Sequence, residues 1–286
     1  MAGPYTPGNL ELVTRNFNTE VHGIVAKKLI FPSLVGTQRS TSGIERFYTE
    51  STTELEGNSQ IPRDAEFYSD QVIIDDSDIR PRKRGLSSRV SWEDTVVTGP
   101  NLPLRTTMRI GNRVSRLVET HLWNTLSEDQ SAVTINTLAT SASWDNATRA
   151  NRIPHEDIAE AVSVVMEPEL QAYVPDTLFL SPRDYAFVRT NDYVMSSFDS
   201  SSPQLMERGV MGMILGLTAV VNPVVTADYS LVADAKKAVT WFEVKDLTSG
   251  TDIGPEQRYV SFYAFSYGQG ARTDPKAACL ITNTRA

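Results

Sequence analysis

Cysteine and histidine are scarce in this 286-residue chain, and their scarcity excludes several kinds of site. Cys279 is the single cysteine, so the chain can form neither an internal disulfide nor a multi-cysteine metal centre. We expect it to be a small buried apolar residue. The three histidines are His22, His121 and His155, and none has a second histidine four residues away, the spacing that places two zinc ligands on one helical face.

The chain also lacks the segments that carry a protein into or across a membrane. No apolar run reaches the roughly 18 residues that a membrane span needs. The first residues, MAGPYTPGNLELVTRNF, do not join a cationic stretch to an apolar one as a secretory signal does. We therefore expect no membrane partner. The 27 basic and 35 acidic residues give a formal net charge of -8, which argues against a generally cationic nucleic-acid-binding protein.

Motifs of catalysis and cofactor binding are missing as well. The sequence contains no nucleophile elbow and no phosphate-binding GxxxxGK[ST] loop. The glycines of GVMGMILG (209–216) and YGQGAR (267–272) lack the dinucleotide-binding spacing, so we expect turns and close-packing points there. The acids of residues 75–78 could offer oxygen ligands to a hard cation, but the remaining ligand spacing is absent. We expect no enzyme, no cofactor and no metal site.

Charge is concentrated in one segment, DDSDIRPRKRG (75–85), where acids and bases stand side by side. Its charged residues are Asp75, Asp76, Asp78, Arg80, Arg82, Lys83 and Arg84. The Debye length is about 8 Å in physiological salt, so the aspartates cancel much of the field of the cations before a polyanion feels it. Such a dipolar strip suits a complementary strip on another protein surface, where charge sets register and partner choice. The alternative is a solvated loop.

The clearest predicted element is a long helix over about residues 103–127. Its apolar residues, from Leu104 to Leu126, recur near the 3.6-residue period, and arginines line much of the remainder. At 1.5 Å per residue this helix would run about 37 Å. A compact chain of this length has a radius of gyration of about 19 Å, so one helix would span most of the molecule as a spine.

Other segments predict a mixed α+β architecture. A second helix is expected to begin at Pro154, with acids in its first turn. Buried strands are expected in 175–182 and 211–225, and a long alternating strand in 258–273. Residues 1–43, rich in Gly, Pro, Thr, Asn and Ser, predict an extended arm that a neighbour would order. Residues 44–90 predict a long two-stranded excursion with the charged segment along one side.

The order of these parts resembles the major capsid proteins of tailed bacteriophages, which have the Hong Kong 97-type capsid fold. The resemblance covers nearly the whole chain and rests on order and spacing. It includes VSWED (90–94) before the long helix, DTLFLSPRDYAFV (176–188) in an α/β unit, GLTAVVNP (216–223), and a long strand near the C-terminus.

The resemblance implies a division of the chain. Residues 1–43 would be the N-terminal arm and 44–90 the extended loop, which lies over a neighbouring subunit. Residues 91–150 with 239–273 would form the peripheral domain that contains the spine helix. Residues 151–238 with 274–286 would form the axial domain around the capsomer symmetry axes. The charged residues of 75–84 would then be inter-subunit contacts.

The resemblance also implies a function and partners. The chain would assemble with itself into hexamers and pentamers of an icosahedral head, a virion capsid built in the host cytoplasm. The head would enclose double-stranded DNA without sequence-specific contacts and would carry a portal and a possible decoration protein. Family members that carry their own scaffold have a long helical segment ahead of the arm. None stands in this sequence, so we expect either a separate scaffolding protein or a scaffolding segment that has been cleaved off.

Two alternatives remain at this point. An encapsulin-type nanocompartment resembles the same fold but encloses protein cargo, so neighbouring genes and shell contents would distinguish it. A metabolic α/β enzyme belongs to a different class, and turnover or small-ligand binding by the monomer would favour it.

Overall fold

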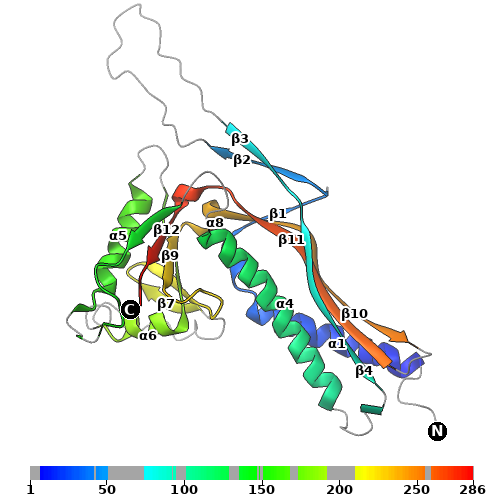
Figure 1. Ribbon diagram of the computed structural model, residues 1–286. Helices are drawn as coiled ribbons and strands as arrows, with labels where there is room; N and C mark the ends of the chain where they lie inside the picture. The colour runs from blue at the N-terminus through cyan, green and yellow to red at the C-terminus, as the bar shows by residue number, and fades with distance from the viewer. Residues whose placement is uncertain are drawn as a thin grey trace, which may run out of the picture.

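The computed structural model describes eleven stretches of the chain and has an elongated part, a compact part and a projecting pair of strands (Figure 1). The described residues are 7–41, 43–50, 74–91, 93–94, 101–128, 135–146, 148, 151–167, 173–191, 210–254 and 259–285. None of the helices in these stretches is long and apolar enough to cross a membrane.

The elongated part is a four-stranded sheet with two helices on one face. Its strands, in spatial order, are β1 (Gly36–Arg39), β10 (Val239–Gly254), β11 (Tyr259–Arg272) and β4 (Arg82–Ser91). β1 runs parallel to β10, and the other neighbours are antiparallel. The helices are α1 (Pro7–Lys28) and α4 (Asn101–Ser127), and a short helix, α2 (Phe31–Leu34), follows α1.

A core between these helices and the sheet holds the elongated part together. The buried residues of this core are Phe17, Val21, Val25, Val90, Ile110, Val114, Leu247, Val260, Phe262 and Ala264. Side chains of β11 alternate between buried and partly exposed along its length, as the period of a strand requires. The alternation predicted from the sequence for 258–273 is therefore confirmed.

The compact part is a six-stranded sheet covered by helices. Its strands, in spatial order, are β5 (Asn136–Ala139), β12 (Ala278–Thr282), β9 (Tyr229–Ala233), β6 (Thr177–Leu180), β8 (Leu217–Val221) and β7 (Val210–Ile214). Its helices are α5 (Pro154–Met166), α6 (Pro182–Arg189), α8 (Ala235–Ala238) and the 3-10 turn η3 (Pro275–Ala277). All four residues of β6 are buried, as the apolar run predicted.

The end of α4 joins the two parts. The buried carboxylate of Glu119 accepts hydrogen bonds from the backbone N–H groups of Ile30 and Phe31 at the start of α2, and from the side-chain amide of Asn222 after β8. The indole N–H of Trp123 donates to the hydroxyl of Thr226 across 2.8 Å. The C-terminal third of α4 is therefore fixed by polar contacts to the start of α2 and to the segment that follows β8 in the compact part.

The C-terminal carbonyl groups of α4 are capped from the long sheet. The guanidinium of Arg272, at the end of β11, donates to the carbonyl oxygens of Thr125 at 2.9 Å and Leu126 at 3.4 Å. A cation at this position also offsets the negative end of the helix dipole.

The N-terminal segment differs from its prediction. Residues 7–28 form a 22-residue helix, not an extended arm, and the helix packs on its own sheet. Phe17, Val21 and Val25 recur every four residues, so they share one helical face that is buried against α4 and the sheet. Tertiary packing of this face, more than helix propensity, accounts for the helix.

The two-stranded excursion is also shorter than predicted. β2 (Glu45–Glu50) pairs antiparallel with β3 (Ile74–Ile79) and projects beyond both parts in Figure 1. β4 does not continue this pair, because it joins the four-stranded sheet beside β11.

Candidate assembly surface

The structure divides the charged segment between two sheets. Asp75, Asp76 and Asp78 belong to β3, whereas Arg82, Lys83 and Arg84 belong to β4; Arg80 lies exposed in the connection between them. The strip predicted to run along one excursion is therefore an acidic strand followed by a basic strand of the neighbouring sheet. Prediction from the sequence missed the change of sheet because the partner of β4 lies about 180 residues further along the chain.

Asp78 of the acidic strand forms an ion pair within the subunit. Asp78 lies opposite Arg46 of β2, and its Oδ1 is 3.2 Å from Arg46 Nε. More than half of each side chain is exposed, at 55% for Asp78 and 59% for Arg46. An ion pair this exposed contributes at most about 1 kcal/mol. Asp78 thus remains accessible to a cation on another molecule.

Arg84 points into the subunit, unlike its two basic neighbours. Its guanidinium donates to the carbonyl oxygen of Gly268 at 2.6 Å and to Oε1 of Gln269 at 2.8 Å. Burial, and secondarily the charge of Arg82, lowers the pKa of Arg84 to about 10. The side chain therefore connects β4 to β11, and its contacts lie within one subunit.

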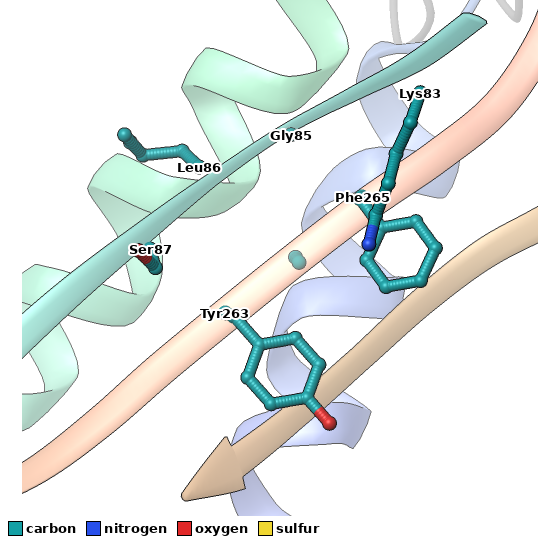
Figure 2. Close-up of a pocket in the computed structure, with 7 residues that line it drawn as sticks. Lys83, Gly85, Leu86, Ser87, Tyr263 and Phe265 are labelled. Carbon is teal, nitrogen blue, oxygen red and sulfur yellow. The ribbon is translucent and has the colours of Figure 1, made fainter.

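Lys83 lies on the opposite face of β4, over an aromatic ring. Its Nζ is 3.6 Å from the centre of the Phe265 ring, and Figure 2 shows it in front of the sheet with the helices behind. Further along the same face, the guanidinium carbon of Arg89 is 4.8 Å from the centre of the Tyr259 ring. Such exposed cation–π contacts contribute about 0.5–1 kcal/mol each, so they orient the cations without burying them.

A shallow groove lies on this face of the sheet, beside the Phe265 and Tyr263 rings (Figure 2). Its lining residues are Lys83, Gly85, Leu86, Ser87, Tyr263, Ala264 and Phe265. The two rings are nearly parallel, at 18°, with centres 6.5 Å apart. The groove is open because β4 carries small residues at positions 85 and 87.

Two glycines make room for these rings. A Cβ on Gly85 would lie 2.4 Å from Cβ of Phe265 and 2.6 Å from the carbonyl oxygen of Ala264. A Cβ on Gly250 would lie 2.5 Å from the hydroxyl of Tyr263. Prediction from the sequence did not single out this surface. The sequence pattern that could have indicated this surface is the spacing of the aromatic residues at 259, 263 and 265, which places them on one face of a strand.

β4 is the edge strand of its sheet among the described strands. An edge strand presents one row of backbone N–H and C=O groups that can pair with another chain. The exposed side chains of Arg82, Lys83 and Arg89 surround this row with positive charge. Charged side chains at an edge discourage indiscriminate pairing while leaving a complementary acidic partner favoured.

His121 and Cys279 have structural surroundings. Nε2 of His121 accepts the backbone N–H of Gly270 at 3.1 Å, and burial, then the charges of Arg84 and Arg82, lowers its pKa to about 4. Cys279 is fully buried, as predicted, and burial raises the pKa of its thiol to about 11. Within the described stretches, no three His, Cys, Asp or Glu side chains gather as metal ligands.

Glu119 is a buried acid of the spine helix that sequence reasoning passed over. Burial raises the pKa of its carboxyl to about 7, against the opposing effect of its three hydrogen bonds. The sequence showed it only as one polar residue among the arginines of the spine helix. Its three partners belong to α2, its flank and the end of β8, so it acts as a structural connector.

Comparison with known proteins identifies the family of the chain. The model of a family described as "Phage capsid protein" matches residues 74–281. A search of curated protein sequences finds no match.

Solved capsid structures share the fold at low sequence identity. A virus-like particle from Pyrococcus furiosus superposes with a TM-score of 0.66 at 13% identity, covering 94% of this chain and 98% of that one. The mature capsid of bacteriophage PhiM1 superposes with a TM-score of 0.61 at 16% identity, covering 90% of this chain and 87% of that one. The capsid of cyanophage P-SCSP1u superposes with a TM-score of 0.64 at 13% identity, covering 89% of this chain and 88% of that one. The predicted Hong Kong 97-type fold is confirmed.

Proposed function

The chain belongs to the phage capsid protein family, and from this premise we propose that it builds the head of a tailed bacteriophage as hexamers and pentamers around double-stranded DNA. Capsid proteins of this kind form the virion shell by binding copies of themselves. Many heterologous contacts, closed by symmetry, produce such a shell.

The projecting β2–β3 sheet is the observation that carries the proposal. A two-stranded sheet is marginally stable alone in water, so it requires a surface to lie on. Its acidic strand, β3, complements the basic edge of β4, and both belong to every copy of the chain. Contact between β3 of one subunit and β4 of the next would give the β2–β3 sheet a surface to lie on and would give the basic β4 edge an acidic partner.

The division of the chain follows the same proposal. Residues 1–43 act as the N-terminal arm, and 91–150 with 239–273 act as the peripheral domain, except that β5 within 91–150 pairs with β12 and is assigned to the axial domain. Residues 151–238 with 274–286 act as the axial domain. Within residues 44–90, the loop that lies over a neighbour ends near Ile79, since β4 pairs with β11. Arg84 is then excluded from the inter-subunit contacts, which retain Asp75, Asp76, Asp78, Arg80, Arg82 and Lys83.

The partners in this proposal are those of head assembly in the host cytoplasm. They comprise a scaffolding protein, a portal, a possible decoration protein, and DNA held without sequence-specific contacts. The subunit performs no catalysis in this role. Its buried ionisable side chains support that reading, because His121 and Glu119 are engaged by backbone and side-chain groups of the fold.

A nanocompartment shell with protein cargo is the second candidate. The observation in its favour is the likeness to the Pyrococcus furiosus virus-like particle, which covers nearly all of both chains. Both candidates require a closed shell, so the contents of the particle distinguish them.

Electron microscopy of the purified chain tests the proposal. The protein is sized by analytical ultracentrifugation and then imaged in negative stain, with and without the products of neighbouring genes. We expect capsomer rings or shells, and nuclease-protected DNA in particles recovered from infected cells. Protein cargo in place of DNA would establish the second candidate. A monomer or dimer under every condition would contradict both.

A further inference from the structure

Four arginines form an exposed row along the first two thirds of α4. Arg105, Arg109, Arg113 and Arg116 are all exposed. Their spacing of four, four and three residues keeps them on one face of the helix. At 1.5 Å per residue the row is about 16 Å long. The buried residues Ile110 and Val114 of the same stretch face the sheet, so the row points away from it.

The row has no counter-charge on its own helix. The one acid between Asn101 and Ser127 is Glu119, which is buried and bound to α2 and Asn222. Among the described residues, no ion pair involves any of the four arginines. This concentration of positive charge stands in a chain whose net charge is -8.

Several other cations of the described fold have partners within the subunit. Arg84 and Arg272 bind backbone carbonyl groups, Arg285 binds Asp184, and Lys83 lies on Phe265. The arginine row is therefore distinguished by facing solvent as a set. A row of like charges held apart on a rigid helix matches a partner of opposite and regular charge.

We propose that the arginine row binds the phosphate backbone of double-stranded DNA, and that the α1–α4 face of the subunit lines the interior of the head. The inference rests on the proposed function, which places DNA inside the shell. A duplex carries about one negative charge per 1.7 Å of axis, so about ten phosphates pass along a row of this length. Guanidinium groups form bidentate hydrogen bonds with phosphate oxygens.

The composition of the row favours DNA over an acidic protein segment. Around Arg113 and Arg116 the exposed neighbours from Asn112 to Thr120 are polar, whereas a protein interface has an apolar centre depleted of charge. The exposed apolar side chains Leu104 and Met108 lie only at the N-terminal end of the row, beside Arg105 and Arg109. Contacts to phosphate alone carry no sequence information, which suits packaging of any genome sequence. Four contacts per subunit are individually weak, so the DNA remains movable while repeated copies hold it near the wall.

The orientation has a structural counterpart on the other face of the sheet. The groove beside Phe265 and the side chain of Lys83 lie opposite the helices (Figure 2). The cation–π pair of Arg89 with Tyr259 lies further along the same face of β4. With the helices inward, this aromatic face is directed outward, where a further protein can reach it.

The test compares two variants that each lose four positive charges. The first carries Arg105→Gln, Arg109→Gln, Arg113→Gln and Arg116→Gln. The matched control carries Arg183→Gln, Arg189→Gln, Lys236→Gln and Lys237→Gln, all exposed and all in the compact part. Binding of the unassembled full chain to a labelled 20-base-pair duplex is measured by fluorescence anisotropy from 50 to 200 mM salt. Circular dichroism confirms that each variant is folded.

The expected result is a change in both affinity and salt dependence. Each phosphate contact contributes about 0.9 to the slope of log K against log salt, so the row variant should lose up to about 3.6 from the slope. Its affinity at 50 mM salt should fall at least tenfold, and the control should bind like the native chain. The pair Arg109→Gln with Arg113→Gln should lose about half of the slope change.

Three outcomes would overturn the inference. The row variant could bind the duplex with an unchanged slope, the control could lose as much affinity, or the native chain could bind polyglutamate more tightly than the duplex. Shell formation is scored separately by microscopy. Shells that form with duplex binding independent of the row contradict this inference alone, whereas absence of shells contradicts the proposed function.

Discussion

Arg285, near the end of the chain, forms a 2.9 Å ion pair with Asp184 at the start of α6, whose carboxylate is completely buried. The same guanidinium donates to Oγ of Ser181, and the backbone N–H of Arg285 donates to Asp228 at 2.9 Å. The end of the chain is thereby tied to two loops of the compact part.

Replacing Arg285 with alanine should destabilise the compact part. Removing one partner of a buried ion pair leaves an uncompensated charge and costs about 3–5 kcal/mol of unfolding free energy. Urea unfolding of the unassembled subunit measures the loss. The control is Arg189→Ala, which replaces an exposed arginine at the end of α6, the helix that carries Asp184. It should change the unfolding free energy by less than about 0.5 kcal/mol. Equal effects of the two substitutions would contradict the structural role of Arg285.

Charge reversal should separate assembly from folding within the short basic segment from Arg80 to Arg84. Arg80→Glu with Arg82→Glu should reduce shell yield while leaving the urea midpoint of the subunit unchanged, because both side chains are exposed. Arg84→Glu should instead lower the unfolding free energy by about 1.5–3 kcal/mol, since its charged hydrogen bonds to Gly268 and Gln269 are lost. Normal shell yield from the double variant would contradict the proposed role of this edge.

Glu119 should make stability fall as pH rises. Its folded pKa, about 7, is above its ordinary value of 4.5, so between these values the folded state holds a proton that the unfolded state has released. The unfolding free energy should therefore decrease from about pH 4.5 to pH 7, by at most about 1.4 kcal/mol per pH unit from this group. Glu119→Gln should flatten that slope, and the exposed Glu167→Gln should not. Urea unfolding across this pH range is the measurement.

The two kinds of glycine in the elongated part should respond oppositely to alanine. Gly85→Ala places a methyl group 2.6 Å from the carbonyl oxygen of Ala264, so β4 must move away from β11. The cost should be about 1–3 kcal/mol. Gly23→Ala meets nothing within 4 Å on α1 and should stabilise the chain by up to about 1 kcal/mol. Thermal unfolding of both variants checks the contrast, and a neutral Gly85→Ala would show that the groove floor is not tightly packed.

The periodic elements were predictable because their signals are local. The spine helix was expected at 103–127 and covers 101–127, and the alternation of β11 follows the sequence residue by residue. α1 was missed because Gly, Asn and Thr obscure the face made by Phe17, Val21 and Val25, and that face is recognisable once α4 is present to bury it.

The candidate surface was only half predictable for a related reason. Sequence gives the charges of residues 75–84 but not the partner of each strand, and pairing with β11 decides that Arg84 turns inward while Lys83 faces outward. A shift of one residue in that register would exchange their roles.

The division of α4 between two cores has a mechanical consequence. Ile110 and Val114 pack in the elongated part, whereas Val118, Leu122 and Leu126 pack in the compact part. The polar contacts of Glu119 and Trp123 fix only the latter end. α4 and the sheet packed on it therefore form one arm that meets the compact part at the base of the helix, and a rotation of about 5° there would displace the far end of this arm by about 2 Å over the roughly 27 Å between them. A rotation of this kind would let a shell adjust its curvature while each subunit keeps its internal hydrogen bonds.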